Sequence, residues 1–133
     1  MTADSARRWF GRVVWLGIAA NAALAVPTLA APARMIALTG LPPATPDLWV
    51  RFAAFLLLLL SAFYAPGAID PRRYRAAAWL SVLARLGGVC FFATQAREYW
   101  VLGAFDFVFL VPEAVLLGRG LRASPPSQGQ SAS

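Results

Sequence analysis

The sequence predicts an all-α integral membrane protein, folded as an antiparallel bundle of four transmembrane helices. Of its 133 residues, 59% are hydrophobic and 14% are charged, whereas a soluble domain usually has about 25% charged residues. The apolar excess is concentrated in four runs. Each run approaches the ~20 residues that an α-helix needs to cross a ~30 Å hydrocarbon core. We place the spans at about 9–31, 48–66, 74–93 and 99–118.

The first apolar run, about 9–31, is expected to be a retained transmembrane helix, because it is too long for the core of a signal peptide. Trp9 and Trp15 lie near its start, as is typical of aromatic residues at a membrane interface. Asn21 falls near its centre. Several prolines follow and exclude a continuous helix, but residues 33–40 (ARMIALTG) are expected to form a short amphipathic segment on the outer surface.

The second run, about 48–66, follows Asp47, which is expected to cap the first free amides of this helix. Arg51 lies about one turn inside, and is expected either to extend toward the membrane surface or to pair with Asp47. A short, turn-rich link to the third run predicts a helical hairpin. In that link, Asp70 and Pro71 have the pattern of an N-cap and a first helical residue, so we expect the third helix to begin there.

The fourth run, about 99–118, contains Pro112, which is expected to kink the helix because proline removes an internal hydrogen bond. The residues after Gly120 are polar and carry too little apolar surface to fold. We therefore predict one four-helix transmembrane domain over residues 1–120, followed by a disordered cytoplasmic tail over residues 121–133.

The arginines flank the four runs unevenly, and this asymmetry predicts the topology. Arg34, Arg51 and Arg97 lie at one set of ends, whereas eight arginines lie at the other. The positive-inside rule therefore places both termini in the cytoplasm. The basic residues are all arginine, which fits a GC-rich bacterial coding bias, so we expect a multi-pass protein of the bacterial cytoplasmic (inner) membrane. No basic patch is interleaved with exposed aromatic residues, so no nucleic-acid partner is expected. The eight arginines are Arg7, Arg8, Arg12, Arg72, Arg73, Arg75, Arg119 and Arg122.

The sequence contains no histidine and a single cysteine, Cys90, which excludes several kinds of chemistry. Haem, copper or zinc sites with histidine ligands are excluded, as is an internal disulfide. We predict no metal site, no catalytic residue and no cofactor, and we interpret Cys90 as a packing residue. A lipid or quinone held by apolar contacts leaves no motif, so a bound molecule of this kind stays open.

Arg85 lies near the centre of the third run, where a lone charge costs at least ~2.5–3.5 kcal/mol and needs a partner. Antiparallel helices place Asp106 of the fourth run at nearly the same depth, so we predict an Arg85–Asp106 ion pair. Gly87 and Gly88 are expected to let these two helices approach closely. Asn21 of the first run is expected to join by hydrogen bonding across helices.

Glu113 lies seven residues after Asp106, about two helical turns, so both carboxylates are expected on one face of the helix. We expect Glu113 in the inner half of the membrane, with Arg12, Tyr64, Ser61 or a water molecule as its partner. Such a network fixes helix register in one interpretation, and lines a polar site or proton path in the other. The predicted network comprises Arg85, Asp106, Glu113 and Asn21, with Arg51, Tyr64 and Arg12 as secondary members.

The stretch LARLGGVCFF, residues 83–92, places a central arginine before two glycines. Together with FYAPGAIDPRRYRAAAWLSVLARLGG, residues 63–88, it resembles the small bacterial four-helix membrane proteins grouped around the DoxX-like families. The resemblance covers spans two to four. It implies the four-helix architecture and an accessory role beside membrane oxidoreductases, and it carries over no catalytic or cofactor-binding residue.

From these observations we expect an accessory or assembly subunit of a bacterial membrane complex, with respiratory or oxidative complexes as one candidate class. Its partners would be the lipid bilayer and other membrane proteins or further copies of itself. One alternative is a small transporter or proton-coupled carrier that uses Arg85 for an anionic group and Asp106 or Glu113 for protons. Another is an intramembrane enzyme acting on a lipid or isoprenoid, which requires Glu113 beside an apolar cavity. The sequence favours a protein that is not an enzyme.

Overall fold

A computed structural model describes residues 1–122 of the chain, and the described structure is helical with no strand. Four of the helices are long and apolar enough to cross a membrane, which indicates a multi-pass membrane protein. The all-α prediction is therefore confirmed. Most of the predicted tail, residues 123–133, lies outside the described part. The elements are α1 (Ala3–Ala30), α2 (Pro32–Thr39), α3 (Leu48–Ile69), α4 (Arg75–Ala93), a 3₁₀ turn η1 (Arg97–Tyr99) and α5 (Trp100–Leu121).

Helix α1 begins six residues before the predicted start of the first span. The Thr2 side chain accepts a hydrogen bond from the Ser5 amide, so the helix is capped well ahead of the apolar run. Arg7 and Arg8 therefore belong to the helix and extend it beyond the apolar segment. Hydropathy marks the part of a helix that is apolar, whereas the cap marks where the helix begins.

The amphipathic segment predicted over residues 33–40 is helix α2, which begins at Pro32. Proline suits the first helical position because its missing N–H has no acceptor there. Gly40 ends the helix in the left-handed conformation with φ of 69°, which glycine adopts without steric cost. Pro32 and Ile36 are buried, so one side of this short helix packs onto the rest of the protein.

The predicted cap of α3 is wrong, whereas Asp70 makes the expected cap-type hydrogen bonds but α4 begins later than predicted. Asp47 makes no capping hydrogen bond, and its carboxylate instead accepts from the Arg51 side chain at 3.3 Å. Asp70 accepts from the backbone amides of Arg72 and Arg73 at 3.0 and 3.1 Å, which closes a turn before α4. Helix α4 consequently begins at Arg75, five residues after the expected cap.

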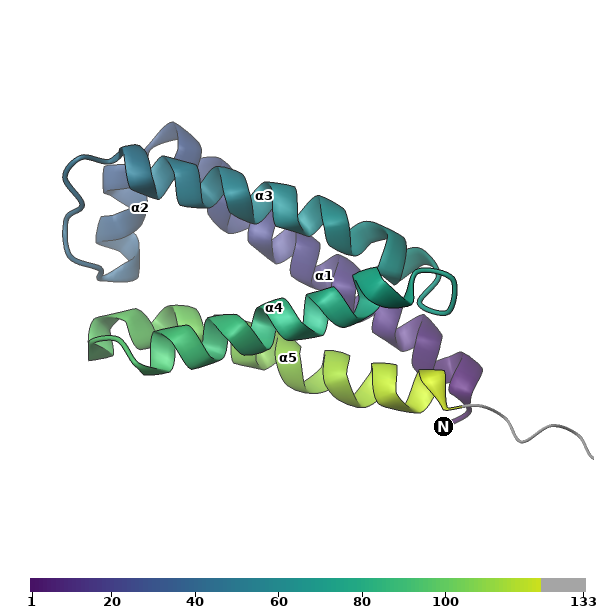
Figure 1. The fold of residues 1–133 in the computed structure, drawn as a ribbon. Helices are drawn as coiled ribbons and strands as arrows, with labels where there is room; N and C mark the ends of the chain where they lie inside the picture. The colour runs from purple at the N-terminus through teal and green to yellow at the C-terminus, as the bar shows by residue number, and fades with distance from the viewer. Residues whose placement is uncertain (123–133) are drawn as a thin grey trace, which may run out of the picture.

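The long helices form two pairs, α1 with α3 and α4 with α5, and α1 also packs against α5 (Figure 1). The pairs converge at the end that holds the N-terminus and separate toward the end that holds α2 (Figure 1). Glycine permits the close approach at the converging end. A Cβ added at Gly11 would lie 2.5 Å from the Ala68 carbonyl oxygen, and one added at Gly67 would lie 2.5 Å from the Ala78 nitrogen.

The hydrophobic core lies at this converging end, because its members come from the first half of α1, the end of α3, the start of α4 and the end of α5. Aromatic and aliphatic side chains fill the space that the close helix approach leaves. The cluster consists of Phe10, Val14, Tyr64, Ala68, Ala78, Val82 and Leu117. The opposite half of the bundle has no comparable cluster among the described residues, and it is there that the helix pairs diverge.

Candidate functional site

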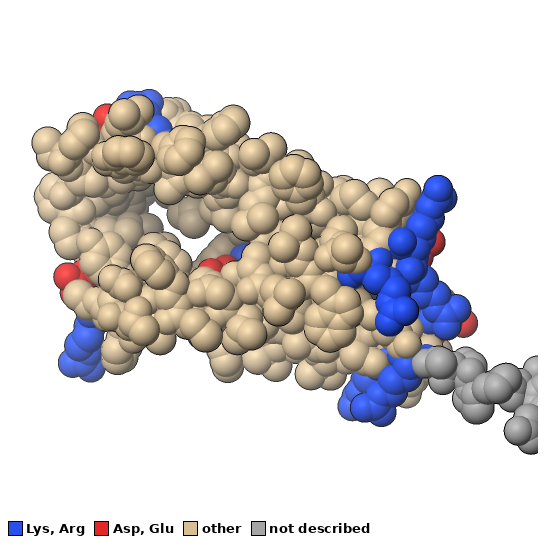
Figure 2. All heavy atoms as spheres, in the orientation of Figure 1, with Lys and Arg blue, Asp and Glu red and all other residues tan. Residues whose placement is uncertain are grey.

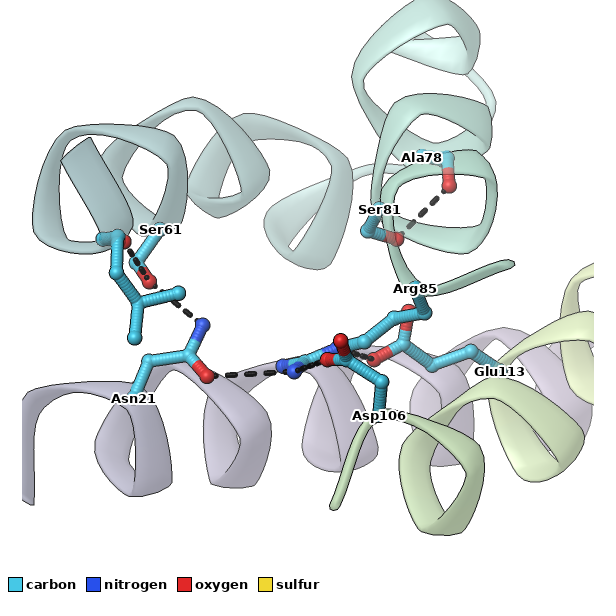
Figure 3. Close-up of polar contacts among 8 residues, drawn as sticks. Asn21, Ser61, Ala78, Ser81, Arg85, Asp106 and Glu113 are labelled. Atoms are coloured by element: carbon cyan, nitrogen blue, oxygen red, sulfur yellow. Dashed lines mark hydrogen bonds and ion pairs between the residues drawn. The ribbon is translucent and has the colours of Figure 1, made fainter. Parts of the chain in front are cut away.

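Arg85, in the middle of α4, is the centre of a buried polar network. Its side chain is 3% exposed, and its Nη1 donates to Asp106 Oδ1 on α5 at 2.8 Å (Figure 3). The same nitrogen donates to Asn21 Oδ1 on α1 at 3.3 Å (Figure 3). The structure thus brings three of the four residues of the predicted network into direct contact, and the guanidinium joins α1, α4 and α5.

Two glycines make room for this arrangement. The Asp106 carboxylate lies directly against Gly88 of α4, where a Cβ would collide with it. A Cβ at Gly17 of α1 would lie 2.8 Å from Arg85 Nη2, so Gly17 leaves space for the guanidinium. Gly87 has nothing within 4 Å, so the expectation that both glycines allow the helix approach is wrong for Gly87. The importance of Gly17 was missed, because no sequence pattern marks which face of α1 meets Arg85.

Aromatic rings on α5 cover the guanidinium on another side. The Arg85 Cζ lies 4.9 Å from the centroid of the Phe109 ring and 5.7 Å from that of Phe105. A guanidinium over an aromatic face is attracted by the negative potential of the ring, by ~2 kcal/mol when desolvated. These rings exclude water from the charge while providing part of the stabilisation that water would give.

Glu113 is also part of the network, but through a partner that the sequence did not predict. Its side chain is 1% exposed, and its Oε1 lies 4.0 Å from Arg85 Nε. Neither Arg85 Nε nor Glu113 Oε2 has a hydrogen-bond partner among the described residues. The two acids share a face of α5 as expected, and the length of the arginine side chain lets one cation reach both of them.

The protein groups expected as partners of Glu113 make other contacts. Arg12 is exposed, with its guanidinium 4.9 Å from the Trp9 ring. Tyr64 is buried in the hydrophobic core. Ser61 donates to the Leu57 carbonyl at 2.8 Å and accepts from Asn21 rather than from Glu113. None of the three protein groups proposed as partners therefore makes a described hydrogen bond to this carboxyl group.

Asn21 extends the network to the fourth long helix. Its side chain is completely buried, and its Nδ2 donates to the Ser61 hydroxyl on α3 at 2.8 Å (Figure 3). Its Oδ1 accepts from Arg85, so one amide side chain connects α3 to α4 (Figure 3). Arg51 does not participate, because it donates to Asp47 and to the Leu29 carbonyl, away from the network, and its side chain is 42% exposed.

A cavity of about 290 Å³ lies beside the network, in the half of the protein where the helix pairs diverge. It is bounded by α1, α2, α3 and α5 and by the end of α4, and Figure 2 shows the hollow on the drawn face, with charged atoms at its inner end. Its lining is mostly apolar. Asp106 is the one charged residue among the described residues that line it, so the cavity reaches the edge of the buried network.

The arrangement contains one more carboxyl group than its arginine can balance. Within residues 1–122, no group of three or more histidine, cysteine, aspartate or glutamate residues could hold a metal ion. The site is thus a buried network in which one arginine faces two carboxyl groups. One of these, Asp106, also borders the apolar cavity.

The described structure is helical, with a charged network that connects all four long helices, and the length and apolar composition of these helices indicate a multi-pass membrane protein. Comparisons with protein-family models, with curated proteins and with solved structures found no match to this chain.

Proposed function

We propose that the protein resides in a bacterial cytoplasmic membrane, with four antiparallel spans and both termini in the cytoplasm. Arg7 near the start of α1 donates to the Gly120 carbonyl near the end of α5 at 2.9 Å, which supports placing both termini on one side. Arg8 and Arg12 lie beside Asp70 of the α3–α4 link at the same end. Basic side chains gather there (Figure 2), as the positive-inside rule expects of cytoplasmic ends.

We further propose that the protein is an accessory or assembly subunit of a membrane complex. The observation that supports this role is that Arg85 is directed into contacts with Asp106, Asn21 and Glu113, rather than toward a substrate path. Mutual contacts of this kind fix the register and orientation of helices, which is the best-attested role of buried polar groups. We propose that the network holds the helices in fixed positions, so that their outer faces form a rigid apolar surface for contact with lipid and other membrane proteins.

The DoxX-like resemblance is part of this proposal. It suggests respiratory or oxidative complexes as the place to look for partners. It also agrees with a chain that lacks histidine and carries one cysteine, because such a subunit would leave redox chemistry to its partners. No catalytic role is proposed for any residue.

A carrier or an intramembrane enzyme receives less support from the geometry. A carrier of the kind considered would expose Arg85 to an anionic solute, yet Arg85 is almost completely buried by its partners. An enzyme of the kind considered would place Glu113 beside the apolar cavity, and Glu113 is not among the described residues that line it. Both alternatives would need the network to open.

Native mass spectrometry of the protein, extracted gently from its own membrane, tests the accessory role. We expect the chain in an assembly with other membrane proteins at a fixed stoichiometry. The same preparation treated with a harsher detergent should release the free chain and serves as the reference mass. Recovery of the chain only as a monomer or as a homo-oligomer, across mild detergents and native nanodiscs, would overturn the proposal.

A further inference from the structure

We propose that the apolar cavity binds a neutral, membrane-dissolved alcohol or phenol, whose hydroxyl group donates a hydrogen bond to Asp106. The inference concerns a small-molecule site and does not depend on the accessory role. Its support comes from the size of the cavity, its apolar lining, and the hydrogen-bonding groups that face it.

The cavity has room for a small apolar group. Its volume of about 290 Å³ is near the lower end of the ~300–1,000 Å³ range of small-molecule sites. At about 30 Å³ per water-sized atom, this space holds roughly ten non-hydrogen atoms. Leu24, Ile36, Leu57 and Phe105 contribute apolar walls from four different segments. Apolar cavities in proteins accept hydrocarbon groups. This one opens at the protein surface (Figure 2), so the surrounding lipid would supply such groups.

The polar side chains at the cavity offer acceptors and no free donor. The Thr28 hydroxyl donates to the Leu24 carbonyl at 2.6 Å, and the Thr39 hydroxyl donates to the Met35 carbonyl at 3.0 Å. These two protons are therefore already used within their own helices, which leaves oxygen lone pairs. An ionised carboxylate such as Asp106 paired with arginine is also an acceptor only. A ligand that donates a hydrogen bond matches this lining, whereas one that only accepts does not.

The charges around the cavity favour a ligand whose hydrogen-bond donor is neutral. Asp106 already binds the Arg85 guanidinium at 2.8 Å, so a cationic headgroup would place a second positive charge beside an existing ion pair. A carboxylate or phosphate would face another carboxylate, because Arg85 is not among the described residues that line the cavity. Glu113 does not alter this choice, since it is 1% exposed and is not among the described residues that line the cavity. A hydroxyl group gives Asp106 a donor without adding charge.

Methionine provides a direct readout, because the chain has two methionines and only Met35 lines the cavity. We would label the full-length protein with methyl-¹³C-methionine in nanodiscs and titrate n-decanol, n-decanoate, n-decylamine and n-decane. Decanol is expected to shift the Met35 methyl signal saturably, and to bind roughly tenfold or more tightly than the other three compounds, because only decanol gives a neutral donor to a charged acceptor. Met1 is the internal control and should not shift.

A matched pair of variants on α3 places the binding site. Ala53→Leu enlarges the side chain at an exposed residue that lines the cavity, and should weaken decanol binding by roughly tenfold or more by filling part of that space. Ala62→Leu makes the same change at an exposed position of the same helix that does not line the cavity, and should leave binding unchanged. The proposal is overturned if Met35 does not respond to decanol, if decanoate, decylamine or decane binds as well as decanol, or if Ala53→Leu has no effect. Because the purified chain is used, these outcomes are independent of whether partner proteins are found.

Discussion

Replacing Arg85 with methionine should destabilise the protein more than any other single arginine substitution in the described residues. The change keeps an unbranched side chain but removes the cation from Asp106, Glu113 and Asn21. Polar pairs inside membranes couple by about 0.6 kcal/mol on average, so three lost contacts give a lower estimate of about 2 kcal/mol. Breaking a buried ion pair in a soluble protein costs ~3–5 kcal/mol, which gives the upper estimate. We therefore expect a loss of about 2–5 kcal/mol.

Unfolding of Arg85→Met by titration with sodium dodecyl sulfate, in mixed micelles, measures this loss against the wild-type protein. Arg51→Met is the comparison variant: its exposed ion pair with Asp47 should be worth ~0–1 kcal/mol, and its hydrogen bond to the Leu29 carbonyl about 1 kcal/mol more. The loss could come from carboxyl groups left without a cation or from altered packing around the lost side chain. A triple variant, Arg85→Met with Asp106→Leu and Glu113→Leu, separates these two causes. If uncompensated acids are responsible, the triple variant should recover part of the stability.

Two results would refute this reasoning. If Arg85→Met were no more damaging than Arg51→Met, the buried contacts would not stabilise the bundle. If the triple variant were as unstable as Arg85→Met alone, the loss would come from altered packing around the Phe105 and Phe109 rings, rather than from unpaired carboxyl groups.

Two further predictions each compare a pair of positions. Gly88→Ala should lower the free energy of unfolding by about 1–3 kcal/mol, seen as a lower midpoint of thermal unfolding, because the added Cβ collides with the Asp106 carboxylate. Gly87→Ala places its Cβ in open space and should be neutral or stabilising by up to ~1 kcal/mol. Equal effects of the two changes would contradict the assigned contact between α4 and α5. The orientation is tested with Arg75→Cys, at the first residue of α4, and Arg97→Cys, in the η1 turn beyond the other end of α4, each combined with Cys90→Ala. A membrane-impermeant maleimide added to intact cells should label Arg97→Cys and spare Arg75→Cys, and the reverse pattern would place the termini outside.

The helices could be predicted from the sequence because each apolar run is long enough to require a helix in lipid. The beginning of α1 could not, because Thr2 and the first arginines lie outside the apolar run. The start of α4 was missed for a related reason: Asp70 has the chemistry of a cap, but its carboxylate is used by the preceding turn. Local sequence identifies a residue that can cap, whereas the path of the chain decides which amides it reaches.

The candidate site shows a similar division. The Arg85–Asp106 contact follows from depth alone, since two antiparallel spans leave few charges at the same level. The contact of Arg85 with Glu113 depends on a long side chain that reaches two acids seven residues apart on α5, whereas depth arguments assign each charge to a single level. The close approach of Arg85 to Gly17 depends on how α1 is rotated about its axis, and the cavity depends on the divergence of the two helix pairs. Neither quantity is encoded in hydropathy.

The position of Asp106 connects these two parts of the molecule. Its Oδ1 accepts from Arg85, while its side chain, 20% exposed, also borders the cavity. On one side of this residue the helices converge through glycine contacts and a packed core, and on the other side they separate around an apolar space. The network therefore lies at the boundary between a closed half and an open half of the bundle. A buried ion pair at such a boundary can do what packing alone cannot: it keeps a carboxylate in a defined place at the edge of an apolar cavity, because Asp106 has a cationic hydrogen-bond partner inside the protein.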